Sequence, residues 1–309
     1  MLRPDAVRHR TEVAMSVMSA VVQGIGQQLQ QHLRTTLAPS PLPSQQGGRA
    51  RVIAVAAQKG GVGKTTTAVN LAVALSQEHG LSTLLVDLDN QGHVASSLRA
   101  HVKGIAAQTV SGALLTPGLE LDLRPAVVAT NLERLWLTGA DKQLGAAEAQ
   151  LATRLGREML LTRALRASRL QFDVIVLDCP PNLGLLTLNA LLAADHVLVP
   201  CDLSVLALEG VDDLMNTIGQ LEMTFGRAPH ILGLLHTRVD KRNHKQNAAI
   251  RRAVAQRYAG LAMETEIAVN TSLPTSQLCG TSVFAAAPDS TGARDYAALA
   301  AEVRAKVFA

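Results

Sequence analysis

Short runs of apolar residues recur along the chain, and polar residues close most of them. A strand buried on both faces of a parallel sheet reads as such an unbroken apolar run of four to eight residues. We therefore predict buried strands over residues 52–57, 81–86, 172–178, 196–200 and 231–235, with a further strand over 134–138.

Between these runs, apolar residues recur every three or four positions, which is typical of amphipathic helices. This spacing predicts helices over 67–75, most of 143–169, from 207 onward, 244–258 and 292–308. Residues 5–37 also have helical spacing, although Gly24 and Gly26 weaken it. A Pro/Gly-rich stretch follows, so we expect a helical extension at 1–37, a linker at 38–50 and one large domain at 51–309.

The composition is that of a globular protein, with 48% apolar and 17% charged residues in 309. No apolar run reaches the 18 residues of a membrane span, and the N-terminus lacks a signal-peptide core. Cys179, Cys201 and Cys279 show no metal-binding spacing, so we interpret each as a small buried residue of a cytoplasmic protein.

The positive charge is unevenly distributed. Residues 1–51 hold six arginines against two acids, so this segment carries the whole formal net charge of +4. A basic extension on a neutral body suggests a polyanionic partner. A helix that only packs or dimerises is the alternative.

The chemically most specific stretch is Gln58 to Thr66, which lies between the first predicted strand and a helix. A strand, a glycine loop, Gly-Lys-Thr and a helix make a phosphate-binding loop. Glycines allow the backbone N–H groups to turn inward, and the helix N-terminus adds positive partial charge. The Lys64 ammonium can reach the β- and γ-phosphates, and the Thr65 hydroxyl can bind Mg²⁺.

Carboxylates follow two of the other buried strands. Asp87 and Asp89 come at the end of the strand at 81–86, and Asp178 closes the strand at 172–178. Because parallel strands end at one edge of the sheet, these acids should lie beside the phosphate loop, where Mg²⁺ and the attacking water gather.

The loop resembles the deviant phosphate loop of the ParA/MinD group of ATPases, because a second lysine, Lys59, stands five residues before Lys64. Asp87-Leu88-Asp89-Asn90-Gln91-Gly92 is similar to that family's Asp-x-Asp-Pro-Gln-Gly, with Asn90 in place of the proline. The segment 179–191 closely resembles the switch that follows the family's Walker B strand, and Ala207 to Gly210 matches a further helix start. Ser204 departs from the glutamate common in the family.

The resemblance spans about residues 51–305. It implies a P-loop NTPase-like α/β fold with a doubly wound, mostly parallel sheet flanked by helices, and ATP and Mg²⁺ as cofactors. The nucleotide would contact Gly60, Gly61, Val62, Gly63, Lys64, Thr65 and Thr66. Thr65, Asp87 and Asp178 would serve the metal. The catalytic residues would be Lys59, which reaches the partner subunit's nucleotide, Lys64, and Asp89, which positions water.

Thr237, Asp240 and Asn270 are the expected contacts on the base side of the nucleotide. Thr237-Arg238-Val239-Asp240 lacks the asparagine of a guanine-specific Asn-Lys-x-Asp motif, so ATP is favoured over GTP. Ile267-Ala268-Val269-Asn270 resembles the family's Ile-Pro-Arg-Asn, with Ala268 replacing proline.

Basic residues are concentrated between 227 and 257, with Asp240 as the acid among them. On the predicted helix at 244–258, Ile250, Val254 and Tyr258 form the inner stripe, so other positions face outward. Such a patch can neutralise DNA phosphates without reading bases. An ordinary solvated helix face is the alternative. The expected DNA contacts are Lys241, Arg242, Lys245, Arg251 and Arg252.

The resemblance therefore implies a DNA partition ATPase. ATP would hold a homodimer together, the dimer would bind nonspecific DNA, and a ParB-type centromere-binding protein would stimulate hydrolysis. The protein would be cytoplasmic, bound to the nucleoid in its ATP state, and would not bind membranes. Two alternatives stay open: a relative that positions protein or membrane-associated cargo, and a reductase resembling the nitrogenase iron protein. The second is weakly supported by the three cysteines.

Overall fold

A computed structural model of the chain describes residues 42–43, 48–118 and 120–308. The predicted helical extension at 1–37 and most of the predicted linker at 38–50 lie outside the described residues. The domain boundaries therefore stay predictions.

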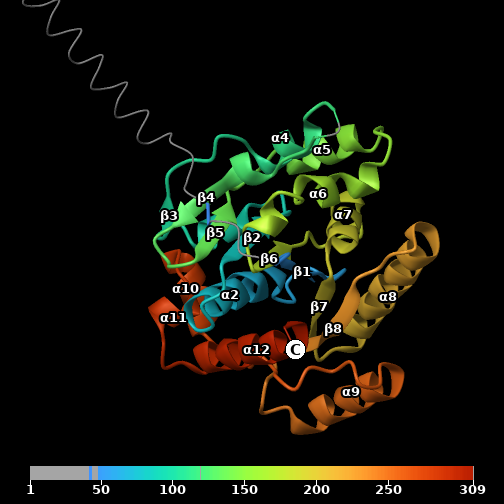
Figure 1. Cartoon of the computed structure of the whole chain (residues 1–309). Coiled ribbons are helices and arrows are strands. Elements are labelled where there is room, and N and C mark those ends of the chain that lie inside the picture. The colour runs from blue at the N-terminus through green and yellow to red at the C-terminus, as the bar shows by residue number, and fades with distance from the viewer. Residues whose placement is uncertain (1–41, 44–47, 119, 309) are drawn as a thin grey trace, which may run out of the picture. The chain divides into compact units, whose positions relative to one another are not determined.

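The described residues form one eight-stranded sheet in the order β3-β4-β5-β2-β6-β1-β7-β8 (Figure 1). β4 runs antiparallel to β3 and β5, and all other neighbouring strands are parallel. The strands are β1 Arg51–Val55, β2 Thr83–Asp87, β3 Val102–Lys103, β4 Val127–Thr130, β5 Leu135–Thr138, β6 Val174–Asp178, β7 His196–Asp202 and β8 His230–Thr237.

Helices connect the strands and cover both faces of the sheet (Figure 1). Three short 3-10 helices also occur, at Arg124–Ala126, Arg157–Met159 and Ser168–Leu170. The α-helices are α2 Lys64–Gln77, α3 His93–Ser97, α4 Val110–Leu115, α5 Leu144–Leu151, α6 Leu160–Ala164, α7 Leu185–Ala193, α8 Val205–Phe225, α9 His244–Arg257, α10 Ser272–Cys279, α11 Val283–Ala286 and α12 Thr291–Val307.

Two hydrophobic cores lie on opposite faces of the sheet, because successive residues of a strand point to opposite sides. In β1, Val52 and Ala54 join the core that includes α4 to α8. Ile53 and Val55 join the other core, which includes α2 and α12. This double burial explains why β1 reads as a continuous apolar run in the sequence.

The carboxyl ends of three central strands lie level with one another. Asp178 at the end of β6 is in register with Val55 of β1 on one side and with Asp87 of β2 on the other. The phosphate loop follows β1 directly, so the sheet brings this loop and both acids to one edge. Ligands of open α/β sheets bind outside this carboxyl edge.

The structure confirms the predicted α/β class and the six strands named from the sequence. The residues predicted as helical over most of 143–169 form several segments and not one helix: α5 ends at Leu151, and Gly156 takes a left-handed conformation (φ 65°) before shorter helical turns. The interpretation of Cys279 as buried is wrong, because it lies exposed at the end of α10. No helix among the described residues has the length and apolar character to cross a membrane.

Candidate active site

The phosphate loop is a tight turn between β1 and α2. Gly61 and Gly63 have positive φ angles of 75° and 87°, which side chains with a Cβ rarely adopt. Gly63 caps α2 without a side-chain hydrogen bond, and the helix begins at Lys64, three residues earlier than predicted. Lys64, Thr65 and Thr66 thus form the first helical turn, whose free N–H groups favour anions.

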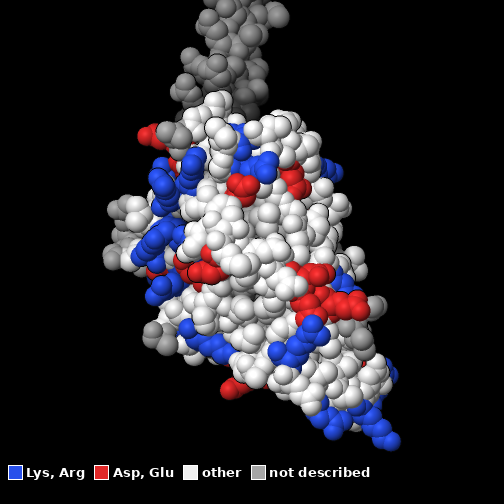
Figure 2. Space-filling model, turned by 90° about the vertical axis from the view of Figure 1, so that its right-hand side faces the viewer, with Lys and Arg blue, Asp and Glu red and all other residues white. Residues whose placement is uncertain are grey.

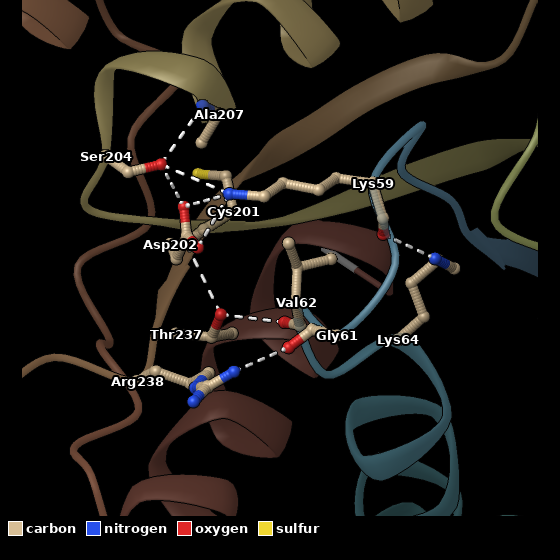
Figure 3. Close-up of polar contacts among 10 residues, drawn as sticks. All are labelled: Lys59, Gly61, Val62, Lys64, Cys201, Asp202, Ser204, Ala207, Thr237 and Arg238. Atoms are coloured by element: carbon tan, nitrogen blue, oxygen red, sulfur yellow. Dashed lines mark hydrogen bonds and ion pairs between the residues drawn. The ribbon is translucent and has the colours of Figure 1, made fainter.

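The Lys64 side chain folds back over this loop. Its Nζ donates a hydrogen bond to the Lys59 carbonyl oxygen at 2.8 Å (Figure 3), and only 7% of the residue is exposed. Burial lowers the pKa of Lys64, and the negative charge of Asp178 opposes that shift. Lys64 is therefore a buried amine held against the backbone of the glycine loop, as phosphate binding requires.

Asp178 is fully buried, and neither of its carboxylate oxygens has a hydrogen-bond partner. Burial and the adjacent Asp87 raise the pKa of Asp178, whereas the neighbouring Thr65 and Lys64 lower it. A buried carboxylate with free oxygens next to a threonine hydroxyl fits Mg²⁺, which is bound by one or two carboxylates and by phosphates.

Asp87 organises the loop that carries Asp89. Its Oδ1 accepts a hydrogen bond from the Asp89 N–H at 3.0 Å, and its Oδ2 accepts one from the Val94 N–H at 3.2 Å. Burial raises the pKa of Asp87 to about 7. Asp89, 8% exposed, accepts a bond from the Gln91 N–H at 3.0 Å. The structure thus brings Asp87, Asp89 and Asp178 together, as the sequence predicted.

Lys59 makes an ion pair within its own subunit. Its Nζ lies 3.0 Å from Asp202 Oδ2 and donates to Ser204 Oγ at 3.3 Å (Figure 3). Ser204 also accepts a hydrogen bond from the Ala207 N–H at 3.2 Å and so caps α8. The sequence pattern did not indicate Asp202, although it ends β7 at the same edge as the other acids.

A pocket of about 430 Å³ opens beside the phosphate loop. Thr237 and Asn270, predicted as base-side contacts, line it, together with Gly61, Gly63, Thr66, Arg238, Ile267, Ala268, Val269, Leu273, Pro274, Gln277 and Tyr296. The Thr237 hydroxyl donates to the Val62 carbonyl oxygen at 2.8 Å, which ties β8 to the loop (Figure 3). Gln277 Nε2 donates to Thr66 Oγ1 at 2.9 Å, which ties α10 to it.

Asp240 does not line this pocket, contrary to its predicted role. Its carboxylate pairs with Arg242 at 2.8 Å, and the Arg242 guanidinium lowers the pKa of Asp240 to about 2. Arg238, a basic residue that was not predicted as a nucleotide contact, lies over the loop instead and donates to the Gly61 carbonyl oxygen at 3.2 Å (Figure 3). The sequence feature that could have indicated Arg238 is its position directly after Thr237, at the carboxyl end of a buried strand.

The predicted DNA patch lies on α9 and the preceding turn. α9 lies at the bottom of the domain in Figure 1. Figure 2, turned about the vertical axis, shows basic side chains at the same height. Two of the five predicted cations are neutralised locally: Arg242 pairs with Asp240, and Arg251 forms a two-bonded pair with Glu266 at 2.6 and 2.7 Å. Lys241, Lys245 and Arg252 are exposed.

The glycine loop, the buried Lys64 and the acids at the carboxyl edge define a P-loop nucleotide-hydrolysing site. Comparisons with known proteins agree. A family model described as an AAA domain matches residues 50–229. Over 255 residues, the chain is 38% identical to the sporulation initiation inhibitor protein Soj of Bacillus subtilis, covering 82% of this chain and 98% of Soj.

Two further matches extend this comparison. An uncharacterised Mycobacterium tuberculosis protein is 34% identical over 301 residues, covering 97% of this chain and 92% of its own. A solved structure of a Mycobacterium smegmatis protein, named cobyrinic acid a,c-diamide synthase and bound to an ATP analogue and magnesium, is 37% identical. It covers 82% of this chain and 93% of its own, with a TM-score of 0.68. The chain belongs to the ParA/Soj family of P-loop ATPases.

Proposed function

We propose that this protein is an ATP-driven dimer switch that binds nonspecific DNA and positions a plasmid or chromosome bound by a ParB-type partner. The observation that supports this most is the placement of Lys59, Lys64 and Asp178 around one loop at the carboxyl edge. The similarity to Soj, which covers nearly all of that protein, favours a related role.

The residues divide the chemistry among them. Backbone N–H groups from Gly60 to Thr66 and the Lys64 ammonium would hold the phosphates of ATP. Thr65 and Asp178 would hold Mg²⁺, which neutralises phosphate charge during transfer. Asp89, in the loop fixed by Asp87, would orient the attacking water. Asn270 and Thr237 would contact the nucleoside end of ATP.

Dimer formation depends on Lys59. For this side chain to reach a partner subunit's nucleotide, it must leave Asp202 and Ser204. Its pair with Asp202 lies at the protein surface, where ion pairs contribute only about 0–1 kcal/mol. The exchange is therefore energetically accessible, and ATP would favour one assembly state over the other.

The dimer switch is tested by sedimentation velocity with a slowly hydrolysed ATP analogue and Mg²⁺. Lys59→Ala should leave nucleotide binding largely intact but prevent analogue-dependent dimerisation. Lys64→Ala is the matched control, because it should abolish nucleotide binding itself, measured by equilibrium dialysis. Dimers of Lys59→Ala that form as readily as the wild type would contradict the proposal.

DNA binding is tested by retention on nonspecific duplex DNA with ATP analogue and with ADP. Lys245→Glu with Arg252→Glu should weaken the analogue-dependent retention and reduce its salt dependence, because each lost phosphate contact lowers the salt exponent by about 0.9. Cargo other than DNA is the second possibility, since such a relative would share the ATPase residues. Analogue-dependent dimers without DNA retention would favour it.

A further inference from the structure

The amino edge of the sheet, at the opposite ends of the strands from the phosphate loop, gathers positive charge. Arg51 and His196 are the first residues of β1 and β7, and His230 is the first residue of β8. We call these side chains and their neighbours the amino-edge cluster, which consists of Arg49, Arg51, Arg169, His196, Arg227 and His230.

The members of the cluster are close in space. β1 pairs with β7 and β7 pairs with β8, so the cluster spans two strand spacings, about 10 Å. The rings of His196 and His230 lie edge to face with centroids 5.8 Å apart. Arg169 is buried beside β1, because its carbonyl oxygen accepts a bond from the Ala50 N–H at 2.7 Å.

Two acids lie against the cluster, and both are engaged within the fold. Asp195 Oδ2 accepts bonds from the Val52 N–H at 2.8 Å and from the buried Arg169 guanidinium, and Asp195 Oδ1 is 3.8 Å from Arg227. Asp173 Oδ2 accepts a bond from the Ser82 N–H at 2.7 Å. Arg49 and Arg51 are exposed and make no ion pair with a described residue.

Electrostatic effects within the cluster agree with this excess of cations. Burial lowers the pKa of Arg169, Asp195 opposes the shift, and the charges of Arg49 and Arg227 lower the pKa further. Burial likewise lowers the pKa of His196. Asp195 opposes this shift, and His230 and Arg51 add smaller contributions in the same direction as burial. The cations therefore act on one another across an edge that two engaged acids do not neutralise.

We propose that the amino-edge cluster is a second contact for the DNA phosphate backbone, and that it operates without ATP. The inference rests on the proposed DNA-binding function but uses another surface than the α9 patch. The nucleotide site lies at the carboxyl ends of the same strands, so occupancy of that site leaves the amino edge in place.

Charge favours DNA as the partner. Duplex DNA presents one negative charge per about 1.7 Å of its axis, so the accessible guanidinium groups of Arg49, Arg51 and Arg227 can meet several phosphates. Arginine, which dominates the cluster, matches phosphate oxygens with two parallel hydrogen bonds. Residues 48–50, which precede β1, bring the exposed Arg49 to this edge.

The experiment measures binding of the full chain in ADP to a labelled nonspecific duplex over a series of salt concentrations. Arg49→Glu with Arg51→Glu should lower the affinity at least tenfold near 0.1 M salt and reduce the salt exponent by about two, the expected value for two lost contacts. Lys142→Glu with Arg304→Glu is the matched control, because it makes the same charge change at exposed positions elsewhere. The control should bind almost as the wild type does.

The outcomes separate this inference from the proposed function. If the amino-edge variant binds the duplex in ADP as tightly as the control does, the inference is wrong, whatever effect the ATP analogue has on DNA retention. If the variant binds less in ADP but ATP analogue never increases retention, the inference stands and the switch fails. Thermal unfolding and ATP-analogue binding of the variant report its folding. If Arg49→Glu with Arg51→Glu binds anionic vesicles less than the wild type does but binds DNA equally well, the cluster contacts membranes and the proposal is overturned.

Discussion

The polar side chains of the active site differ in how many hydrogen-bond partners the fold gives them. Asp87 accepts two backbone hydrogen bonds and Lys59 has two side-chain partners, whereas both oxygens of the buried Asp178 have none. A buried polar group left without a partner costs about 1–3 kcal/mol, and a charged one costs more. The fold therefore keeps Asp178 at the expense of stability, which is typical of a ligand site.

Replacing this carboxylate should stabilise the protein while removing its response to metal. With EDTA, Asp178→Asn should raise the free energy of unfolding by up to about 1 kcal/mol, and the difference should grow as the pH rises, because burial raises the pKa of Asp178 and a neutral amide costs less to bury than a charge. Urea denaturation measures this change. Adding ATP analogue and Mg²⁺ should stabilise the wild type but much less the variant. A variant that is less stable than the wild type in EDTA would contradict this account.

The Lys59–Asp202 pair makes a second prediction at this scale. Asp202→Asn should weaken the hold on Lys59 and so favour analogue-dependent dimers up to about fivefold, since partly exposed pairs contribute about 0.2–1 kcal/mol. The dimer dissociation constant from sedimentation is the readout. Glu209→Gln, in the first turns of α8, is the control, because it removes the same charge from a nearby acid. Weaker dimerisation of Asp202→Asn would mean that Asp202 supports Lys59 in the closed state.

Among the secondary-structure elements, α9 shows how contacts change a charged surface. The helix carries the cations of the predicted patch, but the segment at 262–268 returns beside it and places Glu266 against Arg251. Helical spacing predicted the buried stripe of Ile250 and Val254 correctly. It could not predict a partner from 15 residues further along the chain.

This contact is expected to be sensitive to both substitution and acid. Glu266→Gln should free Arg251 for phosphate binding and raise the affinity of the ATP state for DNA about fivefold near 0.1 M salt. Arg251 holds the pKa of Glu266 below its ordinary value. The pair therefore stabilises the fold above the ordinary glutamate pKa, about 4.3, and this contribution is lost as the pH falls through the lowered pKa.

The measurement compares wild type and Glu266→Gln by thermal unfolding. A difference of roughly 0.2–1 kcal/mol near neutral pH should disappear in acid, because the wild-type carboxylate is then protonated. Asp240→Asn is a comparison, because it removes the other ion pair of this region, between Asp240 and Arg242. A difference that persists unchanged at acid pH would assign the effect to packing.

The sequence predicted the central elements because their signals are local. The runs that end in Asp87 and Asp178 and the glycines before Lys64 specify strands and a turn without help from distant residues. The base side was less predictable, because Gln277 and Arg238 reach the loop only through the fold. The antiparallel β3 and β4 were not predicted at all, since two to four residues carry no readable period.

Over the whole molecule, the last helix covers the helix of the phosphate loop. Tyr296 of α12 is buried, and its hydroxyl lies 3.2 Å from the Thr67 hydroxyl of α2. Glu302 of the same helix accepts bonds from the Glu264 and Thr265 N–H groups at 3.0 and 2.9 Å. The nucleotide site thus depends on residues at the far end of the chain.

Tyr296→Phe tests this dependence with little change in volume. Losing the bond to Thr67 should lower the free energy of unfolding by about 0.5–1.5 kcal/mol, whereas Tyr296→Ala should cost about 3–5 kcal/mol by leaving a cavity. Urea denaturation measures both. Phe284→Ala, at a half-buried site on α11, is a milder comparison. Equal effects of the two Tyr296 variants would mean that ring packing contributes nothing.

The position of β1 in the centre of the sheet has a consequence for biosynthesis. β1 emerges from the ribosome before its two neighbours, β6 and β7, which follow more than a hundred residues later. Such distant pairings delay folding. The nascent chain must therefore carry an unpaired, strongly apolar strand while more than a hundred further residues are made, which makes this segment a natural client for chaperones that shield hydrophobic stretches.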